Sequence, residues 1–228
     1  MDQDSIPIHA AMDFAQTRRL SFVAVLAALA LALASGLGPA ARAAGATADA
    51  PSASVPIHNI RGFLPDLRFT LKGAGDKTVT QEAFKGKTVL LFFGFTNCPD
   101  VCPTTMAQLS QVMANLGDDA QKVRILFISV DPHRDTAEKT QAFVEVFNKN
   151  AVGLTGTEEQ IADVARRYRV AYQIKKPANP RDNNYEVAHS RGVYVFDEKG
   201  RARLLAADTE SVKALTDSVR PLLAQAAQ

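Results

Sequence analysis

Two continuous apolar runs dominate the hydropathy pattern of the chain, at residues 88–95 and 123–130. Runs of this length are typical of strands that are buried on both faces of a sheet. Each run is followed by a segment with apolar residues at helical spacing, 103–116 after the first and 135–150 after the second. Strands that alternate with helices in this way predict a parallel sheet covered by helices.

Shorter patterns predict the remaining elements. Thr157 and Gln160 can form a capping box for a helix over 158–168. We expect a turn at 153–156, where two glycines flank Leu154 and Thr155. Other patterns predict an early hairpin at 69–79, an extended segment at 170–175, a hairpin of strands 193–196 and 202–205, and a closing helix over 210–224.

The first 43 residues follow a different pattern. Arg18 and Arg19 precede the apolar stretch 20–37, and 41–43 offers a small-x-small cleavage site, which is the layout of a secretory signal peptide. An uncleaved membrane anchor is the alternative, because the stretch is at the short limit for spanning a bilayer. Both interpretations predict a location outside the cytoplasm, where thiols meet oxidants and copper.

Composition divides the rest of the chain into a linker and a domain. Residues 44–58 are rich in Ala, Ser, Thr and Pro and predict a flexible tether, so we expect the folded domain at 59–228. The net charge is +2, and no basic stripe or aromatic-basic cluster indicates nucleic-acid binding.

The two cysteines of the chain, Cys98 and Cys102, directly follow the first apolar run. A thiol pair at the end of a buried strand can exchange electrons as a disulfide or hold a soft metal ion. Pro99 and Pro103 disfavour the helical conformation at the residues before them, so we expect Cys102 near the N-cap of the following helix. The positive partial charge at a helix N-terminus favours a thiolate there. This position at the end of the first strand, entering a helix, indicates a thioredoxin-like sheet.

Three residues separate the cysteines, one more than the usual thioredoxin-like spacing. The larger loop can close a disulfide but also leaves room for an ion between the sulfur atoms, which would need a third ligand. The chain has four histidines, of which His9 precedes the apolar stretch, His58 lies in the tether and His133 follows the second strand.

His189 is the better third ligand by topology. It precedes the strand at 193–196, and in a thioredoxin-like sheet the loop into that strand lies beside the cysteine turn. Two thiolates and one imidazole favour Cu(I) or zinc. Three protein ligands leave an ion accessible, as suits delivery, whereas structural zinc sites normally have four.

Three other functions fit a cysteine pair. A thiol-disulfide oxidoreductase would use Cys98 or Cys102 to attack a disulfide and the other to resolve the mixed disulfide. A peroxidase is disfavoured, because position 99 holds Pro where that site needs Thr. A purely structural disulfide across so small a loop would restrain the unfolded chain little.

Four motifs, in order, resemble those of the Sco/SenC family of copper-binding proteins. They are Gly94–Pro103, Ile128–Thr136, Gly153–Gly156 and Tyr185–Ser190. The resemblance implies an α/β, thioredoxin-like fold, in which a central mixed sheet is flanked by helices and preceded by an N-terminal hairpin.

The resemblance also implies a function. Copper would be bound by Cys98, Cys102 and His189, and Cys98 and Cys102 would form a disulfide when oxidised. The protein would deliver copper to the CuA centre of cytochrome c oxidase, or reduce its thiols, in an extracytoplasmic compartment such as the bacterial periplasm.

Two positions depart from the family pattern. Family members usually carry Asp before the ligand histidine, where this chain has Ala188, and we expect this change to alter copper retention or partner choice. The family's aromatic-Gly pattern is replaced by Leu204–Asp208, which changes the expected oxidase-docking surface.

Overall fold

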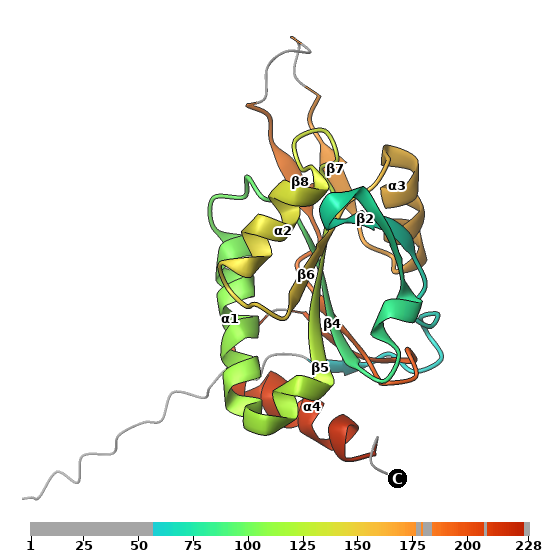
Figure 1. The fold of residues 1–228 in the computed structure, drawn as a ribbon, viewed down its shortest axis with the longest axis vertical. Coiled ribbons are helices and arrows are strands. Elements are labelled where there is room, and N and C mark those ends of the chain that lie inside the picture. Colours follow the sequence, from blue (N-terminus) through green and yellow to red (C-terminus); the bar gives the residue numbers. More distant parts are fainter. Residues whose placement is uncertain (1–56, 177–178, 180–183, 208, 226–228) are drawn as a thin grey trace, which may run out of the picture. The chain divides into compact units, whose positions relative to one another are not determined.

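The computed structural model describes residues 57–176, 179, 184–207 and 209–225 (Figure 1). The predicted signal peptide or anchor, most of the predicted tether, and His9 lie outside the described residues. In the described part of the chain, no helix is both long enough and apolar enough to span a membrane.

A six-stranded mixed sheet forms the centre of the domain (Figure 1). Its β4, β5 and β6 are parallel, β9 runs antiparallel to β4, and β10 and β1 continue the antiparallel edge. In spatial order the strands are β1 (Ile57–Asn59), β10 (Ala202–Ala206), β9 (Val193–Phe196), β4 (Thr88–Gly94), β5 (Val123–Ser129) and β6 (Ala151–Leu154). The sheet begins at Ile57, so His58 lies in an edge strand rather than in the predicted tether, because its backbone pairs with Leu205.

Two hairpins accompany the main sheet. The expected early hairpin consists of β2 (Thr70–Gly73) and β3 (Lys77–Thr80), and β2 contacts the end of β6 through a bridge between Lys72 and Thr155. The second hairpin pairs β7 (Tyr172–Ile174) with β8 (Val187–His189).

Helices cover both faces of the sheet (Figure 1). The helices α1 (Val101–Leu116), α2 (Ala137–Glu145) and α4 (Val212–Gln225) pack on one face, and α3 (Glu158–Arg167) with the β2–β3 hairpin packs on the other. Three 3-10 helices connect the elements: η1 (Ala74–Asp76), η2 (Gln81–Phe84) and η3 (Gly117–Lys122).

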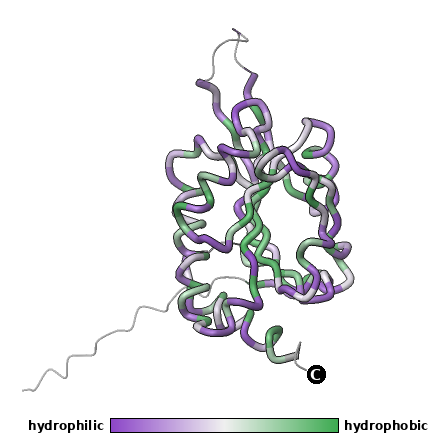
Figure 2. Tube along the Cα trace, viewed as in Figure 1, coloured by the Kyte–Doolittle hydropathy of each residue, from purple (hydrophilic) through white to green (hydrophobic). Residues whose placement is uncertain are grey.

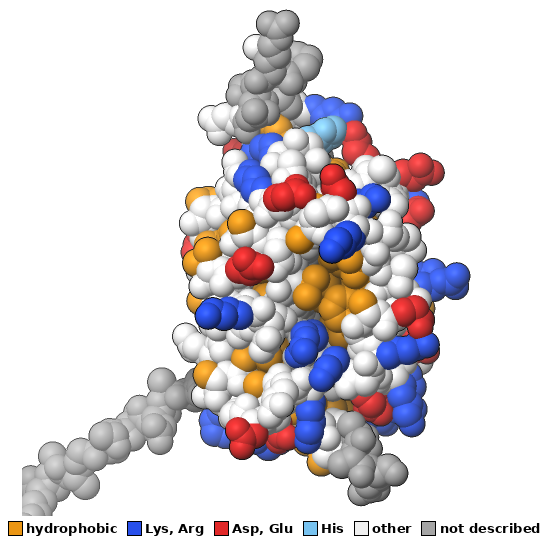
Figure 3. Space-filling model, in the orientation of Figure 1, with side chains coloured by type: hydrophobic (Ala, Val, Ile, Leu, Met, Phe, Trp, Pro, Cys, Tyr) orange, Lys and Arg blue, Asp and Glu red, His pale blue; other side chains and the backbone are white. Residues whose placement is uncertain are grey.

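Alternation along β4 builds a core on each side of the sheet. Leu90 and Phe92 contact the α1 side, whereas Leu91 and Phe93 contact the α3 side. Both central strands are therefore mostly apolar, with Arg124 near the start of β5 as the charged exception (Figure 2). Apolar side chains also occupy the space between β6 and β2 (Figure 3).

Two sequence predictions on this part of the chain are wrong. Residues 153–154 end strand β6 instead of opening a turn, and Gly153 is required by close packing: a Cβ there would lie 2.6 Å from the carbonyl oxygen of Thr140. The second helix ends at Glu145 rather than near 150, which leaves Val146 outside the core and 80% exposed.

Candidate metal centre

The cysteine loop connects the end of β4 to α1. Asp100 is the N-cap of α1 and the helix begins at Val101. Cys102 therefore lies near the N-cap, as expected, but inside the first helical turn, because the helix begins two residues before the predicted start at Pro103. Pro103 is tolerated as the third helical residue because the first four N–H groups of a helix have no partner within it.

The two thiols lie in different environments. Both are free, but Cys102 is 0% exposed while Cys98 is partly exposed. The backbone N–H of Cys102 donates to the Cys98 sulfur at 3.4 Å. Cys98 is therefore the thiol that meets solvent, and its sulfur lies at the N-terminus of α1.

Burial raises the pKa of the Cys102 thiol, and the nearby Cys98 and Asp135 raise it further. The expectation that the helix N-terminus favours a thiolate at Cys102 is thus wrong, because desolvation of the charged form outweighs the helix dipole. Cys102 is a neutral thiol at neutral pH until a ligand displaces its proton.

Gly94, which sequence reasoning missed, makes room for the buried thiol. A Cβ at Gly94 would lie 2.9 Å from the Cys102 sulfur and 2.7 Å from the Phe127 ring. Only a residue without a side chain lets Cys102 pack directly against the end of β4.

His189 lies at the end of β8 and contacts Cys102. Its Nε2 is 3.5 Å from the Cys102 sulfur, and its Nδ1 is 2.8 Å from the Ser190 carbonyl oxygen. Because a carbonyl oxygen can only accept, Nδ1 carries the proton and Nε2 presents its lone pair to the sulfur. The rings of Phe92 and Phe95 lie against the imidazole at 5.9 and 5.8 Å between centroids. Burial lowers the pKa of His189, so the imidazole is neutral and able to act as a ligand.

The other described histidines lie elsewhere. His58 is on the β1 edge, and His133, the other candidate neighbour, faces α3, with its Nε2 3.1 Å from a Glu158 oxygen. The structure thus brings Cys102 and His189 into contact and places Cys98 beside them. Among the described residues, no three His, Cys, Asp or Glu side chains are already gathered closely enough to hold a metal ion.

Asp135, in the loop between β5 and α2, fixes the cysteine loop. Its buried carboxylate accepts hydrogen bonds from the Thr96 backbone N–H at 2.8 Å, the Thr96 hydroxyl at 2.5 Å and the Ser129 hydroxyl at 2.6 Å. A carboxylate with three donors is well satisfied in a buried position, so the start of the cysteine loop is held to the end of β5.

Asp131 and Arg134 fix the segment that leads to His189. Arg134 Nε donates to Asp131 at 2.5 Å, and the Tyr185 hydroxyl donates to the same carboxylate at 2.7 Å. The Arg134 guanidinium also lies 3.8 Å from the centre of the Tyr185 ring and donates to the Tyr185 carbonyl oxygen. Burial, followed by the hydrogen bond to Asp131, raises the pKa of Tyr185 to about 12.

Ala188 is exposed on β8. Successive residues of a strand point to opposite faces, so the Ala188 side chain points away from the cysteines that His189 contacts. A change at position 188 therefore acts on the outer face of the β7–β8 hairpin rather than on the groups around the thiols.

Comparison with known proteins identifies the family of the chain. The SCO1/SenC family profile matches residues 64–224. The chain belongs to the SCO1/SenC family. Mitochondrial SCO2 homolog from Bos taurus is 42% identical over 141 residues, covering 60% of this chain and 52% of the relative. The chain spans about half the length of such curated SCO1/SenC relatives.

Solved SCO1/SenC structures confirm the thioredoxin-like α/β fold. Arabidopsis thaliana ScoI, solved with copper bound, is 34% identical with a TM-score of 0.64, covering 70% of this chain and 98% of that chain. Apo Sco1 from Thermus thermophilus is 33% identical with a TM-score of 0.64, and the match covers 75% of this chain and 99% of that chain. BsSco is described as a member of the Sco family of cytochrome c oxidase assembly proteins. It is 22% identical with a TM-score of 0.56, and the match covers 73% of this chain and 96% of BsSco. At this identity it supports the fold alone.

Proposed function

We propose that the protein carries copper in an extracytoplasmic compartment and delivers it for cytochrome c oxidase assembly. Cys98, Cys102 and His189 would hold the ion as two thiolates and one neutral imidazole, a donor set that suits Cu(I). The contact between the Cys102 sulfur and His189 Nε2, which joins residues 87 positions apart, carries this proposal.

The geometry indicates an order for copper capture. The partly exposed Cys98 meets the incoming ion first, and its sulfur lies beside the backbone N–H of Cys102. Binding at the buried Cys102 requires loss of its proton, while His189 Nε2 needs no deprotonation because the proton is on Nδ1. Release to a partner would reverse this order through Cys98, since its sulfur is the more accessible one.

The proposed partner is the subunit of cytochrome c oxidase that carries the CuA site. A relative solved with copper bound supports copper as the cargo, and the four motifs that resemble the Sco/SenC family support the oxidase as the destination. The N-terminal apolar stretch 20–37 supports export, with the domain either released or anchored at the membrane surface, as in the bacterial periplasm.

A transfer assay tests this function. Copper-loaded protein is mixed with the copper-free CuA domain of an oxidase, and the visible absorption of the mixed-valence CuA centre is measured after ferricyanide has removed one electron from each Cu(I) pair. Transfer from the wild-type protein and its loss with Cys98→Ser are the expected results. A CuA domain that fills equally well from free copper and from the loaded protein would contradict a delivery role.

Thiol-disulfide exchange is the second candidate function. The partial exposure of Cys98 and the N–H donated to its sulfur suit a thiol that attacks a partner disulfide, after which Cys102 would close an intramolecular disulfide. This activity needs no imidazole ligand, so disulfide reduction that survives His189→Ala while copper transfer is absent would favour it.

A further inference from the structure

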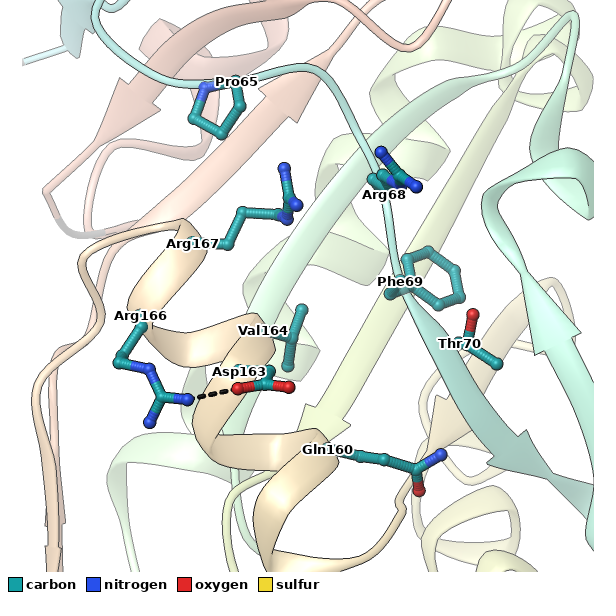
Figure 4. Close-up of a pocket in the computed structure, with 9 residues that line it drawn as sticks. All are labelled: Pro65, Arg68, Phe69, Thr70, Gln160, Asp163, Val164, Arg166 and Arg167. Atoms are coloured by element: carbon teal, nitrogen blue, oxygen red, sulfur yellow. Dashed lines mark hydrogen bonds and ion pairs between the residues drawn. The ribbon is translucent and has the colours of Figure 1, made fainter.

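A groove with no assigned role lies between α3 and the segment that leads into β2. Its main cavity has a volume of about 610 Å³ and is lined by residues from both walls, including Phe69 and Gln160 (Figure 4). A second cavity of about 330 Å³ adjoins it, and both cavities share Pro65, Arg68 and Arg167.

The lining of the groove is rich in positive charge. Its ionisable residues are the basic Arg68, Lys85, Lys87, Arg166, Arg167 and Lys199 and the acidic Asp66, Glu82 and Asp163. Two of these acids are already used, since Glu82 pairs with Lys85 and Asp163 pairs with Arg166.

Arg68 and Arg167 differ from Arg166 in the direction of their side chains and in their ion pairing. They extend from opposite walls toward the same end of the cavity, whereas Arg166 pairs with Asp163 along the helix (Figure 4). Neither Arg68 nor Arg167 forms an ion pair with another described residue, and the remaining acid, Asp66, lines only the smaller cavity. Two like charges that share a cavity repel each other, so an anion between them would be stabilised.

A buried tyrosine fixes the spacing of this pair. Tyr168 follows Arg167 directly, and its hydroxyl accepts a hydrogen bond from the Arg68 backbone N–H at 2.8 Å and donates to the Asp66 carbonyl oxygen at 3.1 Å. Tyr168 is 0% exposed. The backbones that carry the two arginines are therefore held together before any ligand binds, which reduces the entropic cost of binding.

We propose that this groove binds a phosphate group between Arg68 and Arg167. A guanidinium binds oxyanions through two parallel N–H donors, and a phosphate has enough oxygen atoms to serve two guanidinium groups, whereas a carboxylate matches one. Lys87 and Lys199 extend the positive surface beyond the pair. The phosphate could be free in solution or belong to a lipid headgroup.

The groove is remote from the cysteines. Cys102 and α1 pack on one face of the sheet, whereas the groove residues Phe69 and Val164 belong to the core on the opposite face. Phosphate binding can therefore be tested independently of the proposed copper function.

The test uses the full chain, free of copper, at low ionic strength. Sodium phosphate is titrated while the amide NMR signals of Arg68, Phe69 and Arg167 are followed, and a second arm measures co-sedimentation with vesicles of phosphatidylglycerol against phosphatidylcholine. The variants are Arg68→Ala and Arg167→Ala. Arg220→Ala is the control, because it removes an arginine from α4, which packs on the opposite face of the sheet. The apolar stretch 20–37 is present in every variant, so differences in vesicle binding report on the groove.

Saturable binding in either arm is expected, weakened about fivefold or more by each groove variant and little changed by the control. Binding of free phosphate would identify a soluble ligand, and binding of anionic vesicles alone would identify a headgroup. The proposal is overturned if neither probe binds, or if Arg220→Ala weakens binding as much as Arg167→Ala does. Failure of copper binding would leave these outcomes unaffected.

Discussion

Cys102 is fully buried and contacts the partly buried His189, and this burial controls the chemistry of both side chains. Burial raises the pKa of the thiol and lowers the pKa of the imidazole, so both are neutral in the copper-free protein. Cys98 is the partly exposed one of the two thiols. Two consequences at the scale of single residues can be measured.

The two thiols should differ in reactivity. Iodoacetamide at neutral pH is expected to modify Cys98 at least about tenfold faster than Cys102, because only a thiolate reacts and Cys102 is buried with a raised pKa. Mass spectrometry of the reduced protein over time gives both rates. In guanidinium chloride the rates should converge, and equal rates in the folded protein would contradict the assignment.

Acid should destabilise the copper-free domain through His189. Its pKa is lowered in the folded state, so the unfolded chain takes up the proton first as pH falls below about 6.5. The free energy of unfolding contributed by the neutral imidazole is present at higher pH and is lost on acidification. Between about pH 7 and pH 5, His189→Gln should therefore lose less thermal stability than wild type does. The exposed His133→Gln serves as control, and parallel curves for wild type and His189→Gln would refute this account.

At the scale of elements, the β7–β8 hairpin has to be held against the cysteine loop. Each of its strands has three residues, and an isolated hairpin of this kind is marginally stable. The network of Asp131, Arg134 and Tyr185 connects the chain just before β8 to the end of β5. We infer that this network positions His189.

Tyr185→Phe removes one hydrogen bond from this network and leaves the ring in place. Unfolding should be easier by about 1–2 kcal/mol, and amide hydrogen exchange in β8 should accelerate more than in β9. Tyr172→Phe is the matched control, because Tyr172 is on the same hairpin and its hydroxyl makes no hydrogen bond to any described residue. Equal exchange rates in the two variants would show that the network does not hold the hairpin.

A substitution at the junction between β4 and α1 should also destabilise the domain. Gly94→Ala is expected to lower the free energy of unfolding by about 1–3 kcal/mol, because the new methyl group must displace the Phe127 ring and the Cys102 sulfur. Chemical denaturation measures the loss, and iodoacetamide should also reach Cys102 faster in this variant. A variant as stable as wild type would mean that the junction can relax.

For the whole molecule, the sequence predicts the elements best where burial is complete. The long apolar runs place the predicted strands within one residue of β4 and β5, because a strand covered on both faces is apolar over most of its length, here interrupted only by Arg124 near the start of β5. Strand β6 was predicted as a turn, since it is short, lies at the sheet edge and contains a glycine required by packing against Thr140.

The proximity of Cys98, Cys102 and His189 was predictable from the sequence, but the electrostatics around them were not. The cysteine spacing and the thioredoxin-like topology predict that Cys98, Cys102 and His189 lie together. The raised pKa of Cys102 depends on how fully Gly94 and α1 enclose the sulfur, and the hydrogen bond from Tyr185 to Asp131 joins residues 54 positions apart. Neither effect leaves a local pattern in the sequence.

The most direct test of the central claim is a Cu(I) titration of the reduced full chain against a competing chelator. Wild type is expected to bind a single equivalent, with proton release that reflects deprotonation of Cys102. His189→Ala and Cys98→Ser should bind markedly more weakly, and His133→Ala should bind as wild type does. If wild type binds no Cu(I), or if His189→Ala binds it with unchanged affinity and stoichiometry, the three-ligand copper site is contradicted.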